Sequence, residues 1–153
     1  MRQRILLLTM VVAVTMSGFA GVATASGTAS VQQSSASVTF SAQTTGGDTV
    51  TVDSATLPDG GYVTIHDASV TEGNVLGSVA GTSAYLSPGT HENVTVSLTD
   101  AASDGTYVAM AHQETNGDRT YSFVSSNGGT DGPYTADGGA VIARSEERRV
   151  GKE

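Results

Sequence analysis

The most constraining feature of this 153-residue sequence is an alternation of apolar and polar side chains with a period of two. Because successive side chains of a strand point to opposite faces, this alternation predicts strands with one buried face. Outside the first 25 residues, no window has apolar residues at the 3.6-residue spacing of a helix. The alternating runs occupy residues 37–42, 49–53, 62–66 and 93–98, and further predicted strands follow at 107–111, 121–124 and 140–142.

Turn-forming residues separate these runs and complete the prediction of fold class. Examples are Gly46-Gly47-Asp48, Pro58-Asp59-Gly60-Gly61 and Asn116-Gly117-Asp118. Seven or eight short strands with such turns predict an all-β fold, an antiparallel immunoglobulin-like β-sandwich. The run 107–111 is apolar on both faces, which predicts a central strand. Because the sequence lacks the Cys and Trp residues of immunoglobulin domains, the prediction concerns architecture alone.

Residues 1–25 have the pattern of an export signal. A basic start (Arg2, Arg4) precedes an apolar stretch, and small residues predict cleavage after Ala25. The alternative is an uncleaved N-terminal anchor, since about 20 apolar residues span a bilayer. Either reading of this signal helix predicts a domain outside the cytoplasm, extracellular or at the cell surface. Residues 26–36 are rich in Ser, Ala and Gln and predict a flexible leader.

The composition changes at Arg144. Residues 144–153 hold four of the seven basic residues, including the only lysine. The decapeptide matches one reading frame of a common short-read sequencing adapter, and a natural charged tail is the alternative. We interpret it as a sequencing-adapter artefact. The β-sandwich domain is then expected at 37–143, with its last strand truncated and the natural chain continuing to a different C-terminus.

Acidity sets the expected solvent and excludes several functions. Between Ser26 and Ala143 there are twelve acidic residues and one basic residue, Arg119. Molar salt shortens the Debye length to about 3 Å and relieves the resulting repulsion, so we expect a folded domain adapted to brine. Without a basic patch, nucleic acid is not an expected partner. Without cysteine, thiolate metal centres and thiol nucleophiles are excluded.

Four segments resemble a haloarchaeal surface-protein domain family of unknown function: LPDGGYVTIHD (57–67), SAYLSPGTHENV (83–94), AMAHQETNG (109–117) and DGPY (131–134). The resemblance covers roughly residues 37–143 and implies a surface location but no known chemistry. Members are often surface glycoproteins with a threonine-rich stalk and a C-terminal sorting signal processed by an archaeosortase. By this resemblance, the expected partners are envelope glycan or surface proteins. Membrane contact is expected only through the signal, an anchor or a missing C-terminal sorting segment.

Asn93-Val94-Thr95 is the only Asn-x-Ser/Thr acceptor in the sequence. Alternation places Asn93 and Thr95 on the face opposite Val94, so the acceptor is expected to face solvent. We predict glycosylation of Asn93. An unused acceptor is the alternative.

Glu114, Asn116 and Asp118 have the spacing with which calcium loops begin. However, Arg119 stands where such loops place glycine, and Ser125 stands where they place a bidentate glutamate. A calcium-like cation at these three residues is therefore one hypothesis, and a solvated turn is the other. No other cofactor is expected.

Three histidines (His66, His91 and His112) lie on separate segments, so a zinc or copper site is a minor alternative to structural roles. His112 continues the face of Met110, and we expect backbone to satisfy its nitrogen. No nucleophile elbow or Gly-rich phosphate loop is present, and we expect no enzyme. The predicted function is a structural or interaction module of the envelope. The alternatives are a cation-binding extracellular module and, less favoured, an extracellular hydrolase.

Overall fold

A computed structural model describes residues 35–45 and 47–149, with side chains described as far as Ser145. The expected signal and most of the expected leader lie outside these residues. The described residues belong to one compact unit. Within them, no helix has the length and apolar character needed to cross a membrane.

Strands dominate the described residues, so the all-β prediction is confirmed. One 3₁₀ helix interrupts them, and the Asp67 side chain caps its N-terminus by accepting a hydrogen bond from the N–H of Ser69. In chain order the elements are β1 (Ser37–Thr39), β2 (Gln43–Thr45), β3 (Thr49–Leu57), β4 (Gly61–Asp67), η2 (Ala68–Glu72), β5 (Val79–Thr82), β6 (Gly89–Leu98), β7 (Gly105–Gln113), β8 (Thr135–Ala136), β9 (Gly139–Ala140) and β10 (Ile142–Arg149).

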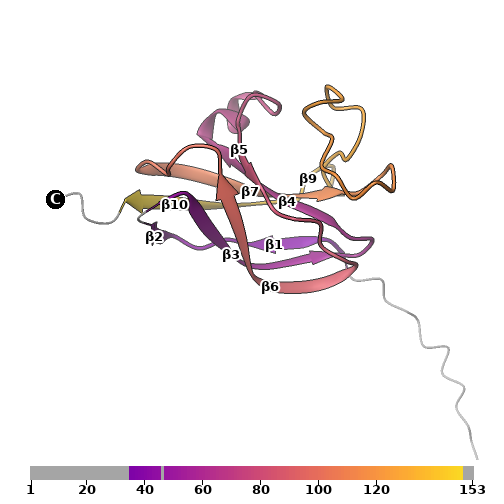
Figure 1. Cartoon of the computed structure of the whole chain (residues 1–153), viewed down its shortest axis with the longest axis horizontal. Helices are drawn as coiled ribbons and strands as arrows, with labels where there is room; N and C mark the ends of the chain where they lie inside the picture. The colour runs from indigo at the N-terminus through magenta and orange to yellow at the C-terminus, as the bar shows by residue number, and fades with distance from the viewer. Residues whose placement is uncertain (1–34, 46, 150–153) are drawn as a thin grey trace, which may run out of the picture. The chain divides into compact units, whose positions relative to one another are not determined.

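Eight strands form one sheet in the order β1-β3-β6-β5-β4-β7-β10-β2, and β8 and β9 form a separate ribbon. All pairings in the sheet are antiparallel except that of β10 with β2. The sheet folds over into two layers, with β1, β3 and β6 in one and β4, β7 and β10 in the other (Figure 1). β5 pairs with both β4 and β6 and joins the layers on one side.

The N-terminal strands join the layers on the other side, because β1 pairs with β3 and β2 pairs with β10. Phe40 lies between these two strands and is buried. The side-chain amide of Gln43 donates to the carbonyl of Thr51 at 2.7 Å and accepts from its N–H at 2.9 Å. Side-chain hydrogen bonds therefore link β2 to β3, so the predicted sandwich is a single sheet almost closed on itself.

The core lies between the layers. Val50 and Val52 of β3 are fully buried and pair with Val96 and Val94 of β6. Burying each such side chain contributes about 1.5–3 kcal/mol. Val63, Ile65, Tyr107 and Ala109 line the same core from the other layer. The alternation in β3 and β6 thus has the predicted effect.

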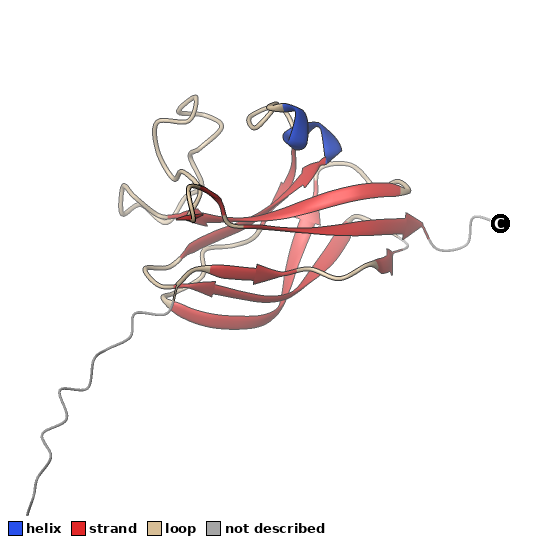
Figure 2. Ribbon diagram, turned by 180° about the vertical axis from the view of Figure 1, so that it is seen from behind, coloured by secondary structure: helices blue, strands red, loops and turns tan. Residues whose placement is uncertain are grey.

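The outer face of β4 and β7 is also buried. Residues 61–66 and 107–112 are buried on both faces, which confirms the predicted central strand at 107–111. η2 and the loop between β7 and β8 both lie on this side of the layer (Figure 2). Among the described residues, no loop or helix covers β3 and β6 of the opposite layer in this way, and Thr49, Thr95 and Ser97 are exposed there.

Two predicted strands differ from the structure. Residues 121–124 form loop and turn and not a strand. The rings of Tyr121 and Phe123 pack against the sheet from this loop. β10 pairs with β7 as far as Glu147, so the strand does not end at Ala143 as expected. Strand pairing uses backbone groups and needs no particular side chains. The origin of residues 144–153 stays a prediction.

Candidate functional site

Polar and aromatic side chains gather on the outer face of β4 and β7. We call this group the outer cluster, and its members are Tyr62, Thr64, His66, His112, Tyr121 and Phe123. β4 and β7 place Tyr62 opposite His112 and Thr64 opposite Met110. Alternate residues of each strand therefore project outward, beneath the two covering segments.

His66 is fully buried and both ring nitrogens are hydrogen-bonded. Nδ1 lies 2.8 Å from the hydroxyl oxygen of Ser78, and Nε2 lies 2.8 Å from that of Thr64. Burial, together with the neighbouring His112, lowers the pKa of His66 to about 4, whereas Asp67 acts in the opposite direction. His66 is therefore a neutral structural imidazole at pH 7.

His112 is fully buried beside it, with the two rings stacked at 6.1 Å between centroids. Its Nδ1–H donates to the backbone carbonyl of Asp131 at 2.7 Å, which confirms the expectation that backbone satisfies this nitrogen. Nε2 has no hydrogen-bond partner among the described residues. Burial lowers the pKa of His112 to about 4, and the Asp131 hydrogen bond and charge oppose that shift.

Asp131 is a fully buried carboxylate, which the sequence suggested only as a further ligand for the cation at Glu114, Asn116 and Asp118. One oxygen accepts from the N–H of Thr115 at 2.9 Å and from its hydroxyl at 3.2 Å. The other oxygen accepts from the N–H of Ser122 at 2.8 Å. Asp131 has a left-handed backbone (φ 52°), and Gly132 follows it. The Asp-Gly pair signalled a turn, but sequence alone could not show that its carboxylate turns inward.

The oxygens of the three predicted cation ligands accept hydrogen bonds from groups of their own loop and, for Glu114, also from Tyr62 of β4. Glu114 accepts from the Tyr62 hydroxyl at 2.6 Å and from the N–H groups of Asn116 and Gly117. Asn116 and Asp118 bond to each other, and Asp118 also accepts from Thr120. The described residues contain no group of three or more His, Cys, Asp or Glu side chains placed to bind a metal. The calcium hypothesis stays a prediction.

Charge and backbone conformation also mark this loop. The Tyr62 hydrogen bond, followed by loop N–H groups, lowers the pKa of the Glu114 carboxyl. Burial, with the same hydrogen bond, raises the pKa of Tyr62. Arg119 has φ 56°, the conformation that a calcium loop assigns to glycine, and its guanidinium lies 5.1 Å from the centre of the Tyr85 ring.

The structure does not bring the three histidines together. His91 lies on β6 in the other layer, and its Nε2–H donates to the carbonyl of Ser87 at 2.7 Å. The zinc or copper alternative is therefore not supported, because only His66 and His112 meet. β4 and β7 are neighbours in the sheet, and their register places His66 opposite Val108 and His112 opposite Tyr62. The two imidazoles therefore approach each other along the outer face and not across a directly opposed pair.

Asn93 is exposed on β6, as predicted, with Thr95 exposed and Val94 and Val96 buried. Its backbone is left-handed (φ 53°), which is unusual within a strand. At this point the alternation of buried and exposed side chains shifts by one residue. The side chains directly before and after Asn93 therefore project to different faces, whereas in a regular strand they would share one. The acceptor thus stands at an accessible irregularity of the uncovered layer.

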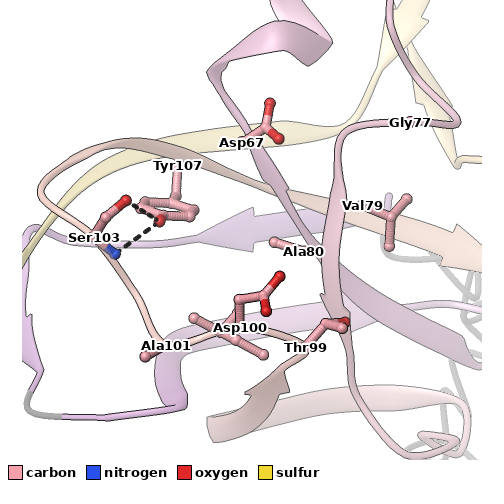
Figure 3. A pocket seen from close by; sticks show the side chains of 10 residues that line it. Asp67, Gly77, Val79, Ala80, Thr99, Asp100, Ala101, Ser103 and Tyr107 are labelled. Carbon is pink, nitrogen blue, oxygen red and sulfur yellow. Dashed lines mark hydrogen bonds between the residues drawn. The ribbon is translucent and has the colours of Figure 1, made fainter.

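A cavity of about 370 Å³ opens where β4 and β6 end and β5 and β7 begin. Val79, Ala80 and Leu98 line it with apolar surface, whereas Asp67 and Asp100 contribute carboxylates (Figure 3). The N–H of Ser103 donates to the Tyr107 hydroxyl at its side, at 3.1 Å. The sequence did not reveal this cavity because the alternating pattern did not indicate β5.

Known proteins match the region that forms this fold. Residues 36–147 match the family described as "Domain of unknown function (DUF7282)". Over 112 residues the chain is 45% identical to "Cell surface glycoprotein 1" and 42% identical to "Cell surface glycoprotein 2", both of Haloarcula hispanica. Each match covers 72% of this chain and 11% of the relative's length. No solved structure matches the chain. The chain belongs to the DUF7282 family of domains of unknown function, in agreement with the resemblance to a haloarchaeal surface-protein family.

Proposed function

We propose that this chain is a β-domain of the halophilic cell surface that has a structural or interaction role. The observation that carries the proposal is its 45% identity, over 112 residues, to a protein named as a cell surface glycoprotein. The relative is much longer, so the domain would be one unit among others in such a protein. Its expected contacts are envelope glycan, surface proteins or neighbouring copies.

The arrangement of polar groups supports a role without catalysis. The carboxylates of Asp131 and Glu114 accept hydrogen bonds from N–H and hydroxyl groups of their own loop and of Tyr62. His66 bonds to two hydroxyls inside the outer cluster. Groups used in this way stabilise loops, whereas a catalytic acid or base needs access to a substrate.

We also propose a glycan on Asn93. The side chain is exposed, it lies on the layer without a covering loop, and Thr95 is exposed beside it. A glycan there would shield the polar face of β3 and β6. Contacts with neighbours would then use other parts of the surface.

Location is tested by producing the full chain in a haloarchaeal host and treating intact cells with a protease active in molar salt. The domain should be removed from intact cells or found in the medium, while a cytoplasmic control protein survives. Retention inside protease-treated cells would refute a surface role.

Glycosylation is tested by intact mass. Protein from the same host should be heavier than its sequence, and the excess should disappear in Asn93→Gln and Thr95→Val but persist in Thr95→Ser. Asn127→Gln is a matched control, because Asn127 is exposed and left-handed (φ 54°) but is not followed by the acceptor pattern. An unmodified Asn93 in the exported protein would refute this part of the proposal alone.

A further inference from the structure

The segment that covers β4 has few buried side chains. We call residues 68–78 the η2 cover. η2 contributes no buried side chain, and within the cover only Ser78 is buried. Asp67 N–H donates to the Ser78 carbonyl at 2.9 Å, and the Ser78 hydroxyl meets His66 at 2.8 Å. Val70, Val75 and Leu76 of the cover are only partly buried, so opening the cover exposes little further apolar surface of its own.

The other cover of this face is anchored more firmly. The loop between β7 and β8 buries Phe123 and Asp131 completely or almost so. Asp131 ties two distant parts of that loop together. Of the two segments that separate the outer cluster from water, the η2 cover is the easier to open.

His66 stands directly beneath this cover, and few charges face it. Asp67 follows it on its own strand, and His112 faces it from β7, with the Asp131 carboxylate beyond His112. The hydroxyls of Tyr62 and Tyr121 belong to the same cluster, and Glu114 is engaged by Tyr62. The η2 cover contributes the Ser78 hydroxyl, while its only acid, Glu72, is exposed.

We propose that His66 is an acid-sensitive latch for the η2 cover: when its imidazole takes up a proton, residues 68–78 open and the sheet beneath stays folded. A buried imidazolium lacks water and faces a second imidazole, so the closed state disfavours the charge. Opening hydrates the ring and leaves it beside the Asp67 carboxylate. Opening the η2 cover breaks fewer buried contacts than opening the loop between β7 and β8, so the ring is hydrated through the η2 cover.

The opening also changes the cavity beside it. Gly77 of the η2 cover and the adjoining Asp67 form part of the cavity wall (Figure 3). Acid would thus widen the entrance on the side of β5. The latch couples proton uptake by one buried residue to the shape of the cavity.

The sign and the range follow from burial. The pKa of His66 is about 4 when closed and lies near the ordinary 6.5 once the ring is hydrated. The free energy that favours the closed state over the open state is highest above pH 6.5. It decreases as the pH falls from 6.5 toward 4. The open fraction should rise up to tenfold per pH unit and by roughly 300-fold in total.

Native-state amide hydrogen exchange of the full chain in molar KCl tests the latch. The reporters are the N–H groups of Asp67 and Ser78, which are bonded to the Ser78 and Asn74 carbonyls. After correction for intrinsic exchange, their protection should fall steeply from pH 6.5 to pH 4. Amides paired between β3 and β6 should keep theirs. Parallel loss in β3 and β6 would mean global acid unfolding and would overturn the latch.

His66→Gln keeps a donor and an acceptor but cannot titrate, so the cover should lose its pH dependence. His91→Gln is the control and should behave as the parent does. If His66→Gln does not fold, Ser78→Ala serves instead. It should lower protection of the cover at pH 7 and raise the His66 titration midpoint observed by NMR toward 6.5. An unchanged midpoint, or pH-dependent protection retained in His66→Gln, would overturn the proposal.

Discussion

Replacing Asp131 by alanine removes the buried carboxylate that holds the loop between β7 and β8. Three hydrogen bonds at 2.8–3.2 Å are lost, from Thr115 N–H, the Thr115 hydroxyl and Ser122 N–H. Bonds to a charged acceptor contribute about 1.5–3 kcal/mol each, but two of these share one oxygen, so the loss is about 4 kcal/mol. Alanine at φ 52° adds about 1 kcal/mol. We expect a total loss of about 5 kcal/mol.

Asp137 provides a matched control for the backbone contribution. It is also followed by glycine and also has φ 52°, but it is exposed in the turn between β8 and β9. Asp137→Ala should therefore cost only about 1 kcal/mol. Asp131→Asn keeps one oxygen acceptor and tolerates the left-handed backbone, so it should fall between the two alanine variants.

The assay is urea unfolding in molar KCl, followed by far-ultraviolet circular dichroism. Domains are typically stable by about 5–15 kcal/mol, so Asp131→Ala should shift the midpoint strongly or leave the chain unfolded. If Asp131→Ala and Asp137→Ala lose the same free energy of unfolding, the buried hydrogen bonds are not what stabilises this loop.

Three further outcomes are expected. Gly61→Ala should prevent folding or cost at least about 3 kcal/mol, because the new Cβ would lie 2.0 Å from the His112 carbonyl oxygen. Gly73→Ala, with open space around it, should cost about 1 kcal/mol. Equal urea midpoints for the two variants would contradict the steric argument. Tyr62→Phe removes the 2.6 Å bond to Glu114 and should lower the free energy of unfolding by about 1–2 kcal/mol, whereas an unchanged value would show that the bond adds nothing. The melting temperature of the parent chain should rise from dilute buffer to molar KCl, because salt screens the repulsion among its acidic residues; a melting temperature independent of KCl would refute the adaptation to brine.

The candidate site was predictable only in part. The exposure of Asn93 followed from alternation, because it depends on the direction of a side chain within its own strand. A backbone partner for His112 was expected, but its identity, the Asp131 carbonyl, depends on a loop from further along the chain. The run 121–124 was misassigned for a related reason. A loop that lays Tyr121 and Phe123 onto a sheet produces the same pattern as a strand with one buried face.

The sequence by itself determined the β character of the domain and the buried side of strands such as β3 and β6, and its acidity predicts adaptation to brine. These properties are local or compositional, since alternation and charge are set by neighbouring residues. Only the tertiary structure decided that His66 and His112 stack, that Asp131 is buried, and that the strands form one sheet that β1 and β2 almost close. The physical reason is that these contacts depend on which distant strands pair and in which register, and neither choice is encoded in the period of any single strand.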